Sequence, residues 1–301
     1  MPLLQFPRAK AQAIIKLLTA WLKPGPSQNT MPSSRYADIL ARIESALDAA
    51  RAVFARFTPG EIGAEYKRGL DPVTEADLAL DKVLHKELLR EGEGWLSEES
   101  VDDASRLNKN RVWVVDPLDG TREFVAGIPE FCISIGFVED GRPVAGGICN
   151  PASGETVIGA IDCGVTYNGA PANASQRRNL SGALILASRS EIKRGEWRQF
   201  SGEGVDIKAV GSVAYKLALV AAGRADASFT LTPKNEWDVI AGAALVESAG
   251  GFVATLDKAK VIGNRRSPRI AGLMACGPFL KDELIALLER HTSIPEQARS
   301  R

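Results

Sequence analysis

The sequence predicts a mixed, layered α/β (α+β) fold, and three observations predict it. Apolar residues recur at helical spacing in residues 36–54 and 74–92. Apolar, strand-like runs stand on both sides of the turn signal Asp140-Gly141, and further helical stretches follow towards the C-terminus. Because hairpin and crossover signals occur together, the fold should combine both kinds of layer.

Residues 1–34 differ in character from the rest of the chain. An apolar stretch at 13–22 is interrupted by Lys16 and is too short to span a bilayer, and no convincing small-residue cleavage site follows it. The segment GPSQNTMPSS at 25–34 is typical of a linker. We therefore predict an N-terminal extension without an integral membrane segment, with an amphipathic membrane-surface helix as the alternative.

Two helices are predicted next. Apolar residues recur at spacings of four and three from Tyr36 to Phe54, which gives one apolar stripe. A second helix should start at Thr74, because Thr74 and Asp77 form a capping box, and should continue to Gly92.

Strands and helices then alternate. Strands are predicted at residues 111–116, 131–139, 143–149, 156–161 and 183–187. Helices are predicted at residues 212–222, 238–249 and 281–290. The polar stretch 169–179 indicates a boundary, so we predict one subdomain over residues 35–175, a second over 176–292 and a tail over 293–301.

Composition narrows the possible functions. Of 301 residues, 37 are Lys or Arg and 37 are Asp or Glu, so a nucleic acid polymer is not an expected partner. His85 and His291 are the only histidines, which excludes sites that need several imidazoles. The four cysteines form no C-x-x-C pair and do not indicate an oxidising compartment, so we expect a cytoplasmic protein whose metal, if any, is held by oxygen.

Acidic residues stand where an apolar strand ends in the segment VWVVDPLDGTREF. Asp116 and Asp119 are three residues apart and can converge on one cation, with the carbonyl oxygen of Leu118 between them. Gly120 and Thr121 offer backbone N–H groups, and a helix beginning here would direct its positive end at a phosphate. The alternative is that both aspartates only cap a turn and a helix.

Two more acidic segments favour a metal site. Glu98 and Glu99 follow an apolar pair, and adjacent carboxylates cannot both be buried without a cation or a proton. Asp238 opens an apolar helix after Trp237, where an N-cap is the competing explanation. Oxygen ligands without imidazole or thiolate suit Mg2+.

The chain resembles the inositol monophosphatase superfamily of magnesium-dependent, lithium-sensitive phosphatases. The resemblance covers about residues 36–290 and rests on five segments in the order and approximate spacing of that superfamily: DPVTEADLALDKVL, WLSEES, DPLDGTREF, GSVAYKLALVAAGRAD and EWDVIAGAALVESAGG. It implies the layered αβαβα sandwich of the inositol monophosphatase and fructose-1,6-bisphosphatase type, and a homodimer. It also implies two or three Mg2+ ions that neutralise the phosphate and stabilise the leaving alkoxide.

The resemblance assigns a role to each matching residue. The metal ligands it implies are Glu98, Asp116, Leu118 through its carbonyl oxygen, Asp119 and Asp238. Thr121 would orient the attacking water together with Glu98 or Asp77, and Glu99 would be a supporting acid. The substrate contacts it implies are Gly120, Thr121, Ser188, Gly211, Ser212 and Asp238. For Ser188 and Ser212, a strand-end turn and a helix N-cap are equally good explanations.

Small departures from the family pattern predict the substrate. Ser97-Glu98-Glu99 stands where many inositol monophosphatases have G-E-E, and DPLDGTREF and Glu236-Trp237-Asp238 resemble the 3'(2'),5'-bisphosphate nucleotidase branch. The leading hypothesis is therefore hydrolysis of 3'-phosphoadenosine 5'-phosphate to AMP and phosphate. The alternatives are an inositol-1-monophosphatase or a related sugar or histidinol phosphate phosphatase and, from another class, a non-catalytic metal- or phosphometabolite-binding protein.

Overall fold

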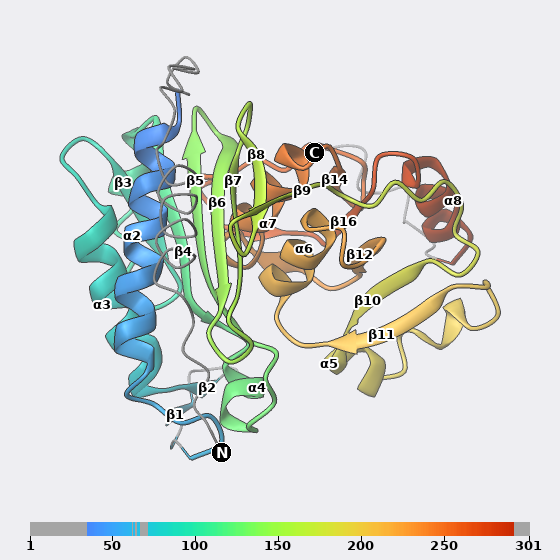
Figure 1. Cartoon of the computed structure of the whole chain (residues 1–301), viewed down its shortest axis with the longest axis horizontal. Helices are drawn as coiled ribbons and strands as arrows, with labels where there is room; N and C mark the ends of the chain where they lie inside the picture. The colour runs from blue at the N-terminus through green and yellow to red at the C-terminus, as the bar shows by residue number, and fades with distance from the viewer. Residues whose placement is uncertain (1–34, 62, 64, 67–71, 292–301) are drawn as a thin grey trace, which may run out of the picture. The chain divides into compact units, whose positions relative to one another are not determined.

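Helices and sheets alternate in layers in the part of the chain that the structure describes (Figure 1). This computed structural model describes residues 35–61, 63, 65–66 and 72–291, so the predicted extension 1–34 and tail 293–301 lie outside the described residues. Three buried apolar clusters separate the layers, one on each side of a large sheet and one on the outer face of a smaller sheet. The predicted layered αβαβα sandwich is confirmed.

The first layer is a pair of helices, α2 (Ala37–Phe54) and α3 (Glu75–Leu88). Their apolar stripes are buried against one face of the large sheet, as the periodicity predicts. The capping box of Thr74 and Asp77 is also confirmed. The helix ends at Leu88 and not at Gly92, because the Leu88 carbonyl accepts a hydrogen bond from the buried Arg42 and Leu89 is already extended.

The large sheet has seven strands in sequential order, of which only the first pair is parallel. Its strands are β3 (Gly94–Ser97), β4 (Arg111–Asp119), β5 (Cys132–Glu139), β6 (Arg142–Asn150), β7 (Glu155–Ala160), β8 (Gly164–Tyr167) and β9 (Ala170–Ala172). Asp140 and Gly141 have φ of 50° and 78°, so the predicted two-residue hairpin is confirmed. The sequence did not predict β3, β8 and β9, because strands of three or four residues leave too short a pattern.

A second pair of helices, α6 (Val213–Ala221) and α7 (Glu236–Ser248), covers the other face of the large sheet. Glycines let α7 approach closely, since a Cβ at Gly146 would lie 2.4 Å from the carbonyl oxygen of Ala241. The helix starts at Glu236 with Asn235 as its N-cap, two residues before the predicted start. The apolar sequence of α7 is explained by its position between two sheets.

The second sheet has five strands, in the order β11 (Asp206–Val210), β10 (Leu184–Ser188), β12 (Ala227–Thr230), β16 (Leu273–Cys276) and β14 (Phe252–Thr255). Helix α8 (Lys281–His291) covers its outer face. The shorter elements are β1 (Glu65–Tyr66), β2 (Pro72–Val73), η1 (Ser105–Asn108), α4 (Thr121–Val125), α5 (Arg189–Lys193), η2 (Arg198–Phe200), β13 (Lys234–Asn235) and β15 (Arg269–Ile270).

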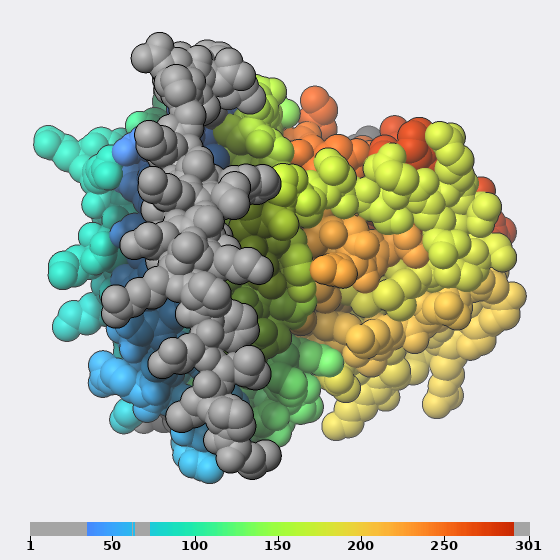
Figure 2. All heavy atoms as spheres, in the orientation of Figure 1, coloured from blue at the N-terminus to red at the C-terminus, as the bar shows by residue number. Residues whose placement is uncertain are grey.

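The two sheets use separate stretches of the chain. The large sheet ends at Ala172 and the second begins at Leu184 in β10, and Figure 2 shows the early part of the described chain (blue to green) and the late part (yellow to red) on different sides. The predicted division between residues 175 and 176 stays a prediction. Among the described helices, none is long and apolar enough to cross a membrane.

Candidate active site and metal centre

A cavity of about 590 Å³ lies where β4 ends and where α4, α6 and α7 begin. Its volume is in the usual range for small-molecule sites. Its walls bring together residues that are more than a hundred positions apart in the chain: Glu98, Asp116, Leu118, Asp119, Gly120, Thr121, Arg122, Glu123, Ser188, Ser190, Arg194, Gly211, Ser212, Val213, Lys216, Thr232, Pro233, Lys234, Asn235, Trp237, Asp238 and Arg269.

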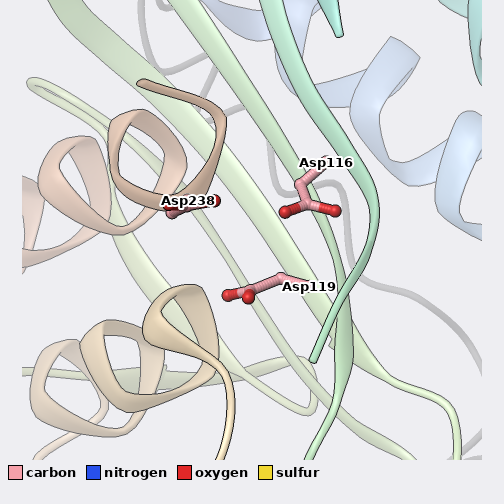
Figure 3. Close-up of side chains that lie close together, drawn as sticks. All are labelled: Asp116, Asp119 and Asp238. Carbon is pink, nitrogen blue, oxygen red and sulfur yellow. The ribbon is translucent and has the colours of Figure 1, made fainter. Parts of the chain in front are cut away.

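Three carboxylates converge in this cavity, those of Asp116, Asp119 and Asp238 (Figure 3). Each offers an oxygen atom, and these oxygens all lie within 4.8 Å of one another. No histidine or cysteine takes part in this cluster among the described residues. We call these three side chains the carboxylate cluster.

A bulge in β4 explains why the first two carboxylates face the same way. Asp116 pairs with Ser134 and Asp119 with Cys132, so three steps along β4 correspond to two along β5. Side chains three residues apart in a regular strand point to opposite faces, and the extra residue restores the same face. The strand therefore does not end at Asp116, as the sequence predicted, but continues to Asp119.

Each aspartate of the cluster also uses an oxygen for local structure. Asp116 Oδ1 accepts the N–H of Leu118 at 3.0 Å. Asp238 is the third residue of α7, and its Oδ2 accepts the N–H of Asn235 at 2.8 Å. Asn235, not Asp238, is the N-cap of α7. One oxygen of Asp238 nevertheless caps the helix start, as the competing explanation predicted, and the other oxygen is left for the cavity.

Thr121 stands at the start of α4, beside the cluster. Its Oγ1 lies 3.0 Å from Oδ1 of the buried Asp77 and 2.9 Å from the carbonyl oxygen of Leu118. Gly120, at φ 98°, is the N-cap of this helix, so the predicted helix start at the cavity is confirmed. Asp77 therefore lies behind Thr121 and is not itself a residue of the cavity wall.

The two adjacent glutamates, Glu98 and Glu99, differ in their position relative to the cavity. Glu98 lines the cavity but is outside the group whose oxygens lie within 4.8 Å, and Glu99 is not in the cavity wall. The charge of Glu98 still acts on the pKa of Asp116 and of Asp238.

The negative charge of the carboxylate cluster is only partly compensated by the lysines nearby. Burial, followed by the charges of Glu98, Asp119 and Asp238, raises the pKa of Asp116 well above its ordinary value. Burial and Asp119 likewise raise the pKa of Asp238 well above its ordinary value. Such a cluster must bind protons or cations, and its all-oxygen donor set fits Mg2+.

The remaining predicted contact residues also reach the cavity wall, which includes Gly120, Thr121, Ser188, Gly211 and Ser212. Ser212 is the N-cap of α6, and Ser188 Oγ lies 2.9 Å from Ser190 Oγ, so both local explanations hold as well. The substrate contacts themselves stay predictions.

Sequence reasoning missed the basic residues of the wall, which are Arg122, Arg194, Lys216, Lys234 and Arg269. Lys234 and Arg269 lie on the paired strands β13 and β15, in which Asn235 is opposite Arg269. Of these five residues, only Lys216 could have been suspected from the sequence, because it is a lysine within the apolar run that forms α6.

Glu236 has a role that the sequence did not suggest. Its buried carboxylate accepts the N–H groups of Asn264 at 2.7 Å and Arg265 at 2.9 Å. It holds a loop and does not line the cavity, so its presence says little about the substrate.

A layered α/β fold that gathers carboxylates at a helix N-terminus defines a class, that of the metal-dependent phosphatases. The profile of the inositol monophosphatase family matches residues 37–293, and the chain belongs to this family. Its members are magnesium-dependent phosphoric monoester hydrolases, and so is this chain.

Individual relatives agree with this assignment. The inositol-1-monophosphatase of Mesorhizobium japonicum is 34% identical over 236 residues, which are 74% of this chain and 87% of the relative. The Nus factor SuhB of Xylella fastidiosa is 35% identical over 62% of this chain and 70% of its own. The crystal structure of the extragenic suppressor protein suhB from Bartonella henselae superposes with a TM-score of 0.72 at 28% identity, covering 85% of this chain and 100% of that one.

Proposed function

We propose that the chain hydrolyses a phosphomonoester whose leaving group carries a second anionic group, with 3'-phosphoadenosine 5'-phosphate as the leading substrate and AMP as product. The observation that carries this proposal is the set of cations that line the cavity besides the carboxylate cluster, above all Lys234 and Arg269. Charge-assisted hydrogen bonds from such groups would hold a second phosphate. A substrate with only hydroxyl groups near Lys234 and Arg269 would leave both side chains without an anionic partner on the substrate.

The metal ligands in this proposal are Asp116, Asp119, Asp238, Glu98 and the carbonyl oxygen of Leu118, which all line the cavity. They would hold two or three Mg2+ ions. When bound, Mg2+ neutralises phosphate charge, lowers the pKa of water and stabilises the leaving oxygen.

The chain's own residues would orient the reactants. The N-terminus of α4 lies at the cavity, where the backbone N–H of Thr121 would favour a phosphate oxygen. The hydroxyl of Thr121, held between Asp77 and the Leu118 carbonyl, would align the attacking water together with Glu98 or Asp77. Glu99 would support Glu98 from outside the cavity.

Inositol 1-phosphate is the second candidate. The observation that favours it is the names of the relatives, among them the inositol-1-monophosphatases of Mesorhizobium japonicum and Rhizobium meliloti, the latter 33% identical over 69% of this chain. A related relative from Thermotoga maritima is named fructose-1,6-bisphosphatase/inositol-1-monophosphatase.

Phosphate release separates the candidates. We expect 3'-phosphoadenosine 5'-phosphate to have a higher kcat/KM than inositol 1-phosphate, fructose 1,6-bisphosphate or histidinol phosphate, each assayed with Mg2+. Lys234→Gln and Arg269→Gln should each raise KM for the bisphosphate at least about 10-fold, because a charge-assisted bond contributes about 1.5–3 kcal/mol. The control is Lys193→Gln, which removes an exposed charge of α5 outside the cavity wall.

A preference for inositol 1-phosphate, unaffected by Lys234→Gln, would refute the bisphosphate substrate in favour of the second candidate. Inhibition by Li+, a homodimer and a cytoplasmic location are further parts of the proposal. Activity with and without Li+ tests the inhibition, and sedimentation of the full chain tests the homodimer. Cell fractionation with and without residues 1–34 tests the location and any attachment to membranes.

A further inference from the structure

The cavity wall includes a buried lysine whose ammonium group interacts electrostatically with Asp119, one carboxylate of the cluster. Lys216 is 2% exposed and lies in the otherwise uncharged helix α6, four residues after the N-cap Ser212. Its Nζ donates to the carbonyl oxygens of Ser212 at 2.5 Å and of Val210 at 3.3 Å. Burial lowers the pKa of Lys216 to about 8, so the ammonium form, with its three donors, is still the major one at pH 7.

The two carbonyls belong to a turn with a costly backbone conformation. Ser212 has φ 56°, in the left-handed region that residues with a Cβ rarely adopt. On its N-terminal side, Gly211 donates its N–H to Glu130 Oε2 at 2.7 Å. Bonds from Lys216 and to Glu130 therefore hold the turn from both sides.

The same turn holds Asp119. Ser212 Oγ donates to Asp119 Oδ2 at 2.7 Å, and the N–H of Ala214 donates to the same oxygen at 2.7 Å. Both donors are placed by the path of the turn into α6, since Ser212 is the N-cap and Ala214 is in the first helical turn. With Oδ2 engaged twice, Oδ1 is the oxygen of Asp119 left for a cation.

We infer that Lys216 is a positioning residue for the metal centre, because its bonds to the Ser212 and Val210 carbonyls keep the turn in the conformation that holds Asp119. The inference rests on the proposed role of Asp119 as a metal ligand, and not on which substrate is hydrolysed. Mg2+ binding measured without substrate therefore tests it independently.

Replacing Lys216 removes both a positive charge and the bonds that hold the turn, and these two losses change the affinity for Mg2+ in opposite directions. A buried positive charge near a cation site repels the cation, so its removal alone would tighten Mg2+ binding. Loss of the turn conformation weakens Mg2+ binding, because Asp119 is no longer held. The sign of the change therefore distinguishes the two effects.

The experiment is calorimetric titration of the full chain with Mg2+ at pH 7.0, together with thermal unfolding to check the fold. Lys216→Met should raise the Kd for Mg2+ at least about 10-fold. Lys216→Gln, which keeps an N–H donor for the Ser212 carbonyl, should recover part of that loss. Lys193→Met, at an exposed lysine of α5, should leave the Kd unchanged.

A double-mutant cycle tests the turn itself. Ser212→Gly loses the Oγ donor but adopts a positive φ without cost, so adding Lys216→Met to it should raise the Kd less than about 3-fold. An unchanged or lower Kd for Lys216→Met, or the same factor in both backgrounds, would overturn the inference. Normal Mg2+ binding without hydrolysis of any tested phosphate would instead count against the proposed function alone.

Discussion

Replacing Asp116 by asparagine should stabilise the metal-free protein while abolishing its response to Mg2+. Asp116 is 2% exposed, and one of its oxygens lies within 4.8 Å of oxygens of Asp119 and Asp238. Two unit charges at that distance repel by about 3.5 kcal/mol at an effective dielectric constant of about 20. Asp116→Asn removes both repulsions, and its amide oxygen can still accept the N–H of Leu118.

Proton uptake relieves part of the repulsion in the wild-type protein, so the expected net gain is smaller, about 2 kcal/mol at pH 7.5. For a chain of 301 residues that raises the midpoint of thermal unfolding by about 3 °C. The pKa of Asp116 is raised in the folded state, so the native cluster binds more protons than the unfolded chain. The wild-type protein therefore loses stability as the pH rises above the ordinary aspartate pKa, and the gap to Asp116→Asn widens towards neutral pH.

The assay is thermal unfolding from pH 5.0 to 8.0, with and without Mg2+. Wild-type protein should gain stability with Mg2+ at pH 7.5, and Asp116→Asn should not. The matched control is Asp226→Asn, at an aspartate that accepts bonds from Leu184 N at 2.8 Å and Arg177 Nε at 3.1 Å. This control should lose about 1–3 kcal/mol and keep the Mg2+ response. The reasoning is refuted if Asp116→Asn is less stable than wild type without Mg2+, or responds to Mg2+ as wild type does.

Three further predictions concern the same site and its support. Mg2+ affinity should rise from pH 5.5 to 8.0, because the raised pKa values of Asp116 and Asp238 let protons compete with the cation, and calorimetry showing a flat profile would contradict this. Thr121→Val should lower kcat about 100-fold or more with little change in Mg2+ affinity, and steady-state kinetics with wild-type kcat would exclude Thr121 from the reaction. Gly146→Ala places a Cβ 2.4 Å from the Ala241 carbonyl oxygen, so thermal unfolding should show a loss of about 1–3 kcal/mol or more, and no loss would mean that α7 can shift freely.

Local signals were the reliable part of the sequence. The capping box of Thr74 and Asp77 and the turn at Asp140-Gly141 involve residues at most three positions apart, and both are confirmed. The strands of the second sheet were mostly missed. β12, β14 and β16 have four residues each, and β12 and β16 are buried on both faces, which removes the alternation that marks a strand.

For the candidate site, too, some residues could be predicted from the sequence and others could not. Asp116, Asp119 and the helix start at Gly120 could be predicted because they lie within five residues of the chain. The basic residues of the cavity wall could not be predicted, since the segments that carry Lys234 and Arg269 meet only when β13 pairs with β15. The resemblance identified the family, while the choice of bisphosphate nucleotide over inositol phosphate still depends on that wall.

The sequence by itself determined which functional groups the site contains, namely carboxylates next to helix N-termini, without imidazole or thiolate. Tertiary structure decided how those groups are used. A bulge in β4 turns Asp116 and Asp119 to one side, and packing of α7 on the large sheet brings Asp238 to them. Hydrogen bonds between near neighbours can be read along the chain, whereas the distance between carboxylates 122 positions apart depends on how helices and sheets pack.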